Sequence, residues 1–230
     1  MENLSLDCDR ILKSIAHRRS VRAFLERTVP QSVIEDLLKT AARAPSGNNS
    51  QPWTVHVLKG TAKARLTQAI MAERAGDTHE PAMEYQYYPE CWPEPYLGRR
   101  REVGWALFKL LGIQKGDRTG SRAWHDRNFD FFGAPVGLIV TMDRRLGLGA
   151  LIDIGMFLEA LAIGARSFGL ETCAQAAFGA YHEVVRSALS LAPEEMVICG
   201  MALGFEDQDA IPNALRTRRV VLSDFATFHD

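Results

Sequence analysis

Three arginines crowd around one serine in residues 17–24, which read HRRSVRAF. If this segment is extended, alternate side chains share a face, so Arg18, Ser20 and Arg22 point the same way while Arg19 points the other way. Two guanidinium groups and a hydroxyl on one face suit a phosphate, which accepts several charge-assisted hydrogen bonds. The segment therefore predicts an anion site, and the alternative is an ordinary solvated surface.

A second polar stretch, PSGNNSQPW, spans residues 45–53. Proline, serine, glycine and asparagine are common turn residues, so a loop without a function is one interpretation. The stretch is also rich in neutral side chains that donate and accept hydrogen bonds: Ser46, Asn48, Asn49, Ser50 and Gln51. Such groups match a planar heterocycle with donors and acceptors along one edge, which is typical of the flavin pyrimidine ring.

A third stretch, LGLGALID at residues 146–153, superficially resembles a dinucleotide-binding fingerprint. Ile152 stands where the third glycine of GxGxxG would be, and no acidic residue ends a second strand about 20 positions later. The sequence therefore does not predict a Rossmann site.

The chain as a whole carries little net charge. Its 230 residues contain 27 Lys plus Arg and 28 Asp plus Glu, so no global field favours nucleic acid or a membrane. The N-terminus lacks the features of a secretory signal, and no apolar run approaches the roughly 20 residues of a membrane span. Four scattered cysteines and histidines without ligand spacing predict a cytoplasmic protein with reduced thiols and no metal.

Hydrophobic periodicity predicts an α+β fold, with a small sheet covered by helices in one domain over residues 1–230. The expected helices cover residues 6–17, 30–43, 62–74, 99–111, 150–167 and 181–191. The expected strands cover residues 53–59, 135–142, 170–174 and 196–203. Residues 117–130 are expected only as a polar stretch that leads into a strand.

Two segments lack regular periodicity. Residues 76–97 contain many prolines, tyrosines and tryptophan, which predicts an ordered, lid-like insertion. Residues 205–230 have few apolar residues until VVL and FATF, which predicts a tail that packs on another subunit.

Four motifs in order resemble the FMN-dependent nitroreductase family: RRSVR, APSGNNSQPW, GLETCAQAAF and RTRR. The resemblance covers roughly residues 10–226. Three longer stretches also resemble the subgroup that reduces nitrobenzoates and related nitroaromatics: WPEPYLGRRREVGWALFKLLGI, FFGAPVGLIVTMDRRLG and CGMALGFED.

The resemblance implies a small mixed β-sheet and an intertwined homodimer, with FMN at the subunit interface and the tail, residues 205–230, wrapped around the partner. It implies that Arg18, Arg19, Ser20 and Arg22 bind the phosphate and ribityl group of FMN, with Arg216 and Arg219 as further basic ligands. It assigns the flavin ring to Pro45, Ser46, Asn48, Asn49 and Gln51. It places the backbone of Ala176 and Ala177 near flavin N5.

The chemistry that the resemblance implies is a ping-pong reaction. NADH or NADPH passes a hydride to flavin N5 and leaves, and a small aromatic oxidant then takes two electrons. The cofactor carries the difficult step, so no catalytic side chain is expected, and Cys173 is expected to be a packed core thiol. The alternatives are reductive dehalogenation or quinone reduction on the same fold, and a flavin-free regulatory protein that binds an anion.

The lid-like insertion supplies the predicted substrate residues. Aromatic faces stack on an electron-poor nitroarene, so Tyr85, Tyr88, Trp92 and Tyr96 are expected to wall the pocket. One of the three arginines that follow, Arg99 or a neighbour, is expected to attract a substrate carboxylate. The alternative is that the aromatic rings pack the loop onto the body and that the arginines are solvated.

Overall fold

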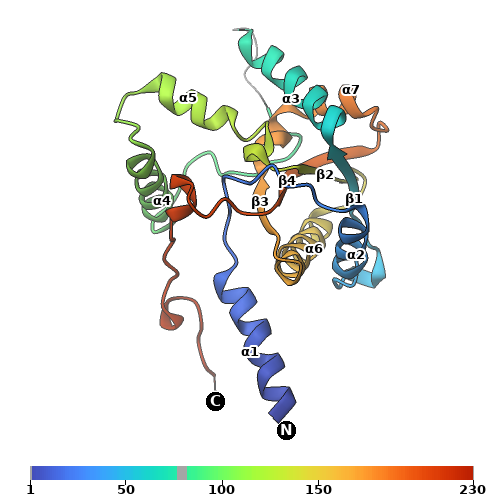
Figure 1. Ribbon diagram of the computed structural model, residues 1–230, viewed down its shortest axis with the longest axis vertical. Coiled ribbons are helices and arrows are strands. Elements are labelled where there is room, and N and C mark those ends of the chain that lie inside the picture. Colours follow the sequence, from blue (N-terminus) through green and yellow to red (C-terminus); the bar gives the residue numbers. More distant parts are fainter. Residues whose placement is uncertain (1, 77–81, 230) are drawn as a thin grey trace.

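A four-stranded antiparallel sheet lies between two layers of helices (Figure 1). This computed structural model describes residues 2–76 and 82–229. The strands, in the spatial order β1-β2-β4-β3, are β1 (Thr54–Lys59), β2 (Val136–Asp143), β4 (Glu195–Gly204) and β3 (Glu171–Gln175). The prediction of a mixed sheet is wrong for these strands, because every strand pair is antiparallel. Strand direction depends on the path of the connections, which periodicity does not reveal.

The α-helices agree closely with the predicted ones. They are α1 (Glu2–His17), α2 (Gln31–Ala41), α3 (Gly60–Ala75), α4 (Tyr96–Leu111), α5 (Arg118–Asp126), α6 (Leu148–Ser167) and α7 (His182–Leu189). Only α5 was not predicted as a helix. It is capped by Asp117, whose carboxylate accepts from the Gly120 N–H at 2.8 Å, and it contains few apolar residues.

The two helical layers explain why the central strands read as continuous apolar runs. On one face of the sheet, α3 and α7 bury Leu66, Ile70 and Val185 against Ile139. On the other face, α2 and α6 pack a second cluster that includes Phe157. Strands β2 and β4 are buried along almost their whole lengths, and each fully buried large apolar side chain contributes about 1.5–3 kcal/mol.

Two glycines in the central strands make room for aromatic rings. A Cβ on Gly137 would lie 2.6 Å from the Phe131 ring, and a Cβ on Gly200 would lie 2.3 Å from the Phe178 ring. Those two rings stack on each other with centroids 4.5 Å apart. The sheet therefore requires glycine at both positions because the ring pair lies directly on the backbone.

Helix α6 differs from the prediction in one respect. By length and composition it is the one helix in the described part of the chain that could cross a membrane, whereas no such run was expected. Core helices of folded proteins meet the same criterion. Here α6 packs against α2 and the sheet through Ile154, Phe157 and Leu161, so burial accounts for its composition.

The tail divides into two parts. Residues 205–215 pack on their own chain: Leu25 N–H donates to Phe205 O at 2.9 Å, and Asn213 is almost fully buried. This corrects the expectation that the whole of residues 205–230 lacks a core. Beyond this part the chain extends away from the body, in the same direction as α1 (Figure 1). It exposes four apolar side chains: Val221, Leu222, Phe225 and Phe228.

Candidate functional site

The arginine-rich segment is extended, as predicted, and lies beside the edge strand β3. Ser20 forms an isolated bridge with Thr172, and the Val21 N–H donates to Thr172 O at 3.0 Å. A second bridge joins Phe24 to Glu206. The segment is therefore held between β3 and the packed part of the tail.

Asn213 fixes this arrangement from the far end of the chain. Its Oδ1 accepts from the Arg22 N–H at 2.7 Å, and its Nδ2 donates to Ala23 O and Asp207 O, each at 2.8 Å. All three bonds satisfy backbone groups that burial would otherwise leave without partners. No local sequence pattern predicts this residue, because its contacts span about 190 residues.

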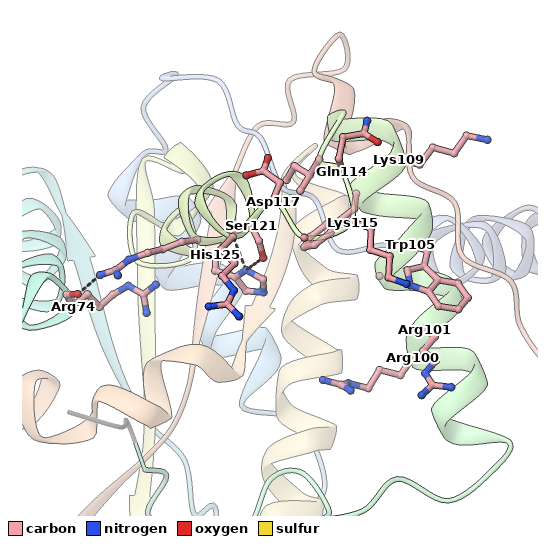
Figure 2. Close-up of a pocket in the computed structure, with 16 residues that line it drawn as sticks. Arg74, Arg100, Arg101, Trp105, Lys109, Gln114, Lys115, Asp117, Ser121 and His125 are labelled. Carbon is pink, nitrogen blue, oxygen red and sulfur yellow. Dashed lines mark hydrogen bonds between the residues drawn. The ribbon is translucent and has the colours of Figure 1, made fainter. Parts of the chain in front are cut away.

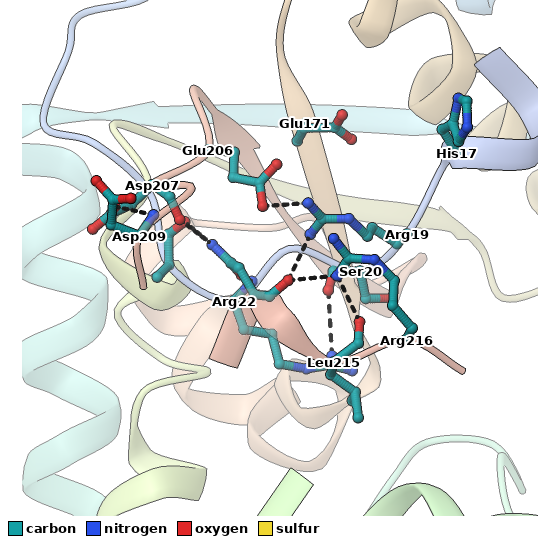
Figure 3. Close-up of polar contacts among 12 residues, drawn as sticks. His17, Arg19, Ser20, Arg22, Glu171, Glu206, Asp207, Asp209, Leu215 and Arg216 are labelled. Atoms are coloured by element: carbon teal, nitrogen blue, oxygen red, sulfur yellow. Dashed lines mark hydrogen bonds and ion pairs between the residues drawn. The ribbon is translucent and has the colours of Figure 1, made fainter. Parts of the chain in front are cut away.

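A cavity of about 770 Å³ opens beside this segment. Figure 3 shows the polar contacts of several residues that line it, among them Arg19, Ser20 and Arg22. Its lining includes Ser20 and six arginines: Arg18, Arg19, Arg22, Arg166, Arg216 and Arg219. Three carboxylates also line it: Glu159, Glu171 and Glu206. The structure therefore brings both predicted basic clusters to one cavity, which keeps an excess of positive charge.

The carboxylates divide the arginines into two groups. Arg18 pairs with Glu159 at 3.3 Å and Arg19 with Glu206 at 2.5 Å, so each already has an anionic partner. The Arg22 guanidinium donates only to Ser20 O, at 3.3 Å, among the bonds of the described residues. Arg216 and Arg219 likewise bond only to neighbouring oxygens of the tail. Arg22 is therefore the cation of the N-terminal segment that is most available to an anion.

Arg166 and Glu171 add a charged pair that was not among the predicted site residues. They lie on either side of the turn from α6 to β3 and form an ion pair. Burial raises the pKa of Glu171 above its ordinary value despite the opposing Arg166 charge. The buried Arg166 Nε has no hydrogen-bond partner within the described chain. An unsatisfied donor beside uncommitted guanidinium groups fits a phosphate in this cavity.

The polar loop at residues 45–51 adopts an unusual backbone. Asn48, Asn49 and Gln51 all have positive φ, at 51°, 58° and 48°. Such values are uncommon outside glycine, and they point to a functional constraint. Ser46 Oγ accepts from the Gln51 N–H at 3.0 Å, which closes the loop on itself.

One hydrogen bond ties this loop to the body. The Gly47 N–H donates to Asp153 Oδ2 on α6 at 3.1 Å. Within the described part of the chain, this is the only hydrogen bond that joins residues 46–51 to another element. Asp153 is only 9% exposed. The side-chain amides of Asn48 and Asn49 have no bond within this part of the chain, so they are free to meet a ligand.

The predicted flavin residues lie in two separate places on one chain. Ala176 and Ala177 follow β3 directly, at the start of η3 (Ala176–Tyr181). Since Thr172 pairs with Ser20, β3 leads from the cavity to Ala176 over about 13 Å. The loop at residues 45–51 does not line the cavity. Within one chain, β3 thus connects the basic cavity to the Ala176 stretch, whereas the polar loop is not part of the cavity lining.

The aromatic residues of the insertion contact one another ring to ring on the surface of the body. Residues 77–81 of the insertion lie outside the described residues. Tyr85 donates to Ile198 O at 2.7 Å, and its pKa is raised by burial. Ring contacts continue from Tyr85 through Tyr87 and Tyr88 to Trp92. This geometry favours the packing alternative for Tyr85. Tyr88 and Tyr96 are exposed and Trp92 is partly so, and their place in a substrate pocket stays a prediction.

The three arginines after the insertion point to different sides of α4. Arg99 lies over the Tyr96 ring at 5.5 Å, and Arg100 lies over the Trp92 ring at 5.4 Å. Arg99 faces a small cavity shared with the tail, whereas Arg100 and Arg101 line a larger pocket between α4 and α5. One carboxylate would therefore not engage all three.

Glu84 anchors the insertion to the body. Its carboxylate, only 8% exposed, accepts from Arg144 at 2.7 Å, from Arg186 at 3.3 Å and from the Val197 N–H at 3.1 Å. Burial alone would raise the pKa of Glu84, but the hydrogen bonds from Arg144 and Val197 outweigh it and the pKa is lowered. The ionised form is therefore the one that the fold stabilises.

This lowered pKa predicts how stability depends on pH. A carboxyl whose pKa is lower in the folded state adds stability above its unfolded pKa and loses that contribution as pH falls. We expect Glu84→Gln to cost about 1.5–3 kcal/mol near pH 7 and much less near pH 3, measured by urea unfolding. A matched change at the exposed Glu35 should cost little at either pH, and an equal Glu84→Gln cost at both would contradict the assignment.

Two of the free cysteines, Cys173 and Cys199, are buried, whereas Cys91 is exposed. Cys173 is buried in the core, and burial raises the pKa of its thiol although Arg22 and Ser20 oppose this, which confirms the prediction of a packed thiol. Cys91 and Cys199 are also free thiols. No group of potential metal ligands occurs among the described residues.

Comparison with known proteins agrees with this architecture. The Nitroreductase family model matches residues 15–205. The chain is 42% identical over 208 residues to a 4-nitrobenzoate reductase of Nocardioides sp. (strain LMS-CY), covering 89% of this chain and 84% of the relative. It is 40% identical to the chloronitrobenzene nitroreductase of Comamonas testosteroni, covering 93% and 94%.

A solved structure shows the same fold. It is the FMN and NADPH-dependent nitroreductase NfnB from Sphigopyxis sp. strain HMH, which superposes with a TM-score of 0.93 at 33% identity over 96% of this chain and 99% of that chain. The protein therefore belongs to the nitroreductase family, as the sequence motifs predicted.

Proposed function

We propose that the protein is an FMN-dependent NAD(P)H oxidoreductase that reduces nitroaromatic compounds such as nitrobenzoates. The observation that carries this proposal is the cavity beside Ser20, where Arg22, Arg216 and Arg219 have no carboxylate partner in the described chain. Its excess positive charge fits a phosphomonoester. The names of the relatives, which are nitroaromatic reductases, agree with the activity that the sequence predicted.

Bound FMN would supply two-electron hydride chemistry, and the protein's own residues would bind, orient and shield it. Arg22 and Ser20 would hold the phosphate, and the edge strand β3 would bring the backbone of Ala176 toward the ring. Asn48, Asn49 and Gln51 offer hydrogen bonds to the polar edge of the ring. No side chain is required to act as an acid or base in this scheme.

A second copy of the chain would complete the site. The polar loop does not line the basic cavity of its own chain, and we infer that one cofactor would meet the loop of one subunit and the cavity of the other. Ile11 and Leu12 on α1, Leu148 on α6 and Phe225 and Phe228 in the tail expose apolar surface that a partner would cover. We therefore infer a homodimer with a shared flavin site, in a cytoplasmic, single-domain protein.

The direct test of the function is the absorbance spectrum of the purified protein, followed by kinetics. We expect the bands of bound FMN, and oxidation of NADPH or NADH that depends on a nitroaromatic. A panel of nitroaromatics, quinones and halophenols separates nitro reduction from quinone reduction and dehalogenation. A protein that takes up no flavin even when incubated with FMN would instead be an anion-binding protein without redox activity.

The tie between Gly47 and Asp153 predicts a measurable effect on the flavin. Asp153→Leu should weaken FMN binding roughly 10-fold or more, because a charge-assisted hydrogen bond of about 1.5–3 kcal/mol no longer holds the loop. Asp153→Asn keeps an acceptor and should have a smaller effect. FMN titration of the apo-protein measures both, with Asp36→Asn on the exposed face of α2 as the control. Equal affinity in all variants would mean that the loop needs no anchor.

The arginines of α4 predict selection of a substrate carboxylate. Replacing Arg99 by Ala should reduce kcat/KM for 4-nitrobenzoate more than for nitrobenzene, by on the order of 1 kcal/mol for a partly exposed ion pair. Arg100→Ala and Arg101→Ala form the comparison, since they face the other side of α4. The same fractional loss on both substrates in every variant would exclude a role for these charges in selection.

A further inference from the structure

The pocket between α4 and α5 concentrates positive charge (Figure 2), with a larger excess of cations over carboxylates than the basic cavity beside Ser20. Its volume is about 1150 Å³, and it is lined by seven arginine and lysine side chains but by one carboxylate, that of Asp117. The whole chain has nearly equal numbers of the two charge types, 27 and 28. The single acid is already used, because it caps α5.

Four of these cations are uncommitted. Arg101, Lys109, Lys115 and Arg118 make no side-chain hydrogen bond or ion pair among those of residues 2–76 and 82–229. The others are engaged: Arg74 pairs with Asp126, for example, and Arg122 donates to a backbone carbonyl. Mutual repulsion of uncommitted cations around one pocket favours the capture of a polyanion.

An aromatic surface lies among these charges. Trp105 on α4 is 69% exposed, and Phe108 lines the same pocket one helical turn further on. A large exposed indole beside cations matches a purine, which stacks on aromatic rings while phosphates meet the basic groups. The volume and the number of charges exceed what a nitrobenzoate, with one carboxylate, would use.

We propose that this α4–α5 pocket binds the adenosine phosphate end of the reduced dinucleotide, and that it selects NADPH over NADH through the 2′-phosphate. This inference rests on the proposed function and identifies its electron donor. In this arrangement Lys115 and Arg118, in the turn and at the start of α5, meet the phosphates, and Trp105 stacks on the adenine.

Calorimetric titration of the FMN-bound protein with adenosine 2′,5′-bisphosphate and with 5′-AMP tests the site without turnover. The bisphosphate should bind about tenfold or more tightly than 5′-AMP. The double variant Lys115→Glu/Arg118→Glu should lose that preference, and Trp105→Leu should weaken both ligands more than Trp105→Phe does. Lys39→Glu/Arg65→Glu, which makes the same charge change on the exposed faces of α2 and α3, should behave like the wild type.

Anaerobic flavin reduction by each nicotinamide provides the second measurement. In the double variant the half-saturating NADPH concentration should rise about tenfold or more, that for NADH should rise less, and the limiting rate should stay unchanged. The site would be overturned if the wild type and the double variant bound the bisphosphate equally well. It would also be overturned if the wild type did not bind the bisphosphate because a second subunit covers the pocket. If the double variant binds the bisphosphate and uses NADPH as the wild type does, while the wild type reduces nitroaromatics, only the site fails; if neither nicotinamide reduces the flavin of the wild type, the proposed function fails with it.

Discussion

Removal of residues 221–230 should convert the protein from a dimer into a monomer that has lost most of its flavin. This truncation keeps Arg216 and Arg219, so it leaves the basic cavity intact and removes only the extended apolar end. Phe228 is 82% exposed in one chain, and Val221, Leu222 and Phe225 are also exposed. Covering each such side chain is worth about 1.5–3 kcal/mol before the entropic cost of association, and 1.4 kcal/mol is about tenfold in Kd.

Light scattering measures the mass, which should fall from twice 25.6 kDa to 25.6 kDa. The bound flavin is read from the same sample by absorbance. Ser223→Ala/Thr227→Ala changes the same segment without removing apolar surface and should leave both values unchanged. A truncated protein that remains dimeric, or a monomer that still holds FMN with wild-type affinity, would contradict the shared site.

Arg22→Ala should weaken FMN binding by about 10- to 150-fold while leaving the fold intact. Its guanidinium is the one in the N-terminal segment without a carboxylate partner, so its charge is available to the phosphate. A charge-assisted hydrogen bond contributes roughly 1.5–3 kcal/mol, which gives this range. Ser20→Ala should cost less, since a neutral hydroxyl donates a weaker bond.

Titration of apo-protein with FMN provides the measurement, and Arg27→Ala provides the control. Arg27 follows this segment and lies over the Phe205 ring, outside the cavity lining. Arg22→Lys should recover part of the affinity, because the charge remains although the planar fork is lost. If Arg22→Ala and Arg27→Ala bind FMN equally well, the arginine cluster is only a solvated surface.

The features that local periodicity encodes were predictable. The extended segment with Arg18, Ser20 and Arg22, the apolar central strands and all helices except α5 follow from spacing within about 20 residues. Helix α5 was missed because its nine residues are mostly polar and include few apolar side chains. The antiparallel order of the sheet was missed because it depends on how three helices return the chain between β1 and β2.

The partners of the site arginines could not be predicted in the same way. Glu159, Glu206 and Asn213 reach the N-terminal segment from more than 140 residues away, and only the tertiary fold makes them neighbours. Arg166 and Glu171 are the exception: a basic residue in the last turn of a helix and an acidic residue at the start of the next strand are five positions apart. That spacing across a turn was a usable signal.

The bonds of Asn213 also set the order in which the protein can be completed during synthesis. They join residues that are 190 and 191 positions apart, and Arg19 reaches Asn213 O across 194. Domains fold as the chain emerges from its N-terminus, and contacts of such long range form late. The first 24 residues therefore leave the ribosome early, but their bonds to Glu206 and Asn213 form only after the last strand has emerged. The basic cavity is then one of the last parts of the protein to form, so the nascent chain cannot capture its anion before its synthesis is nearly finished.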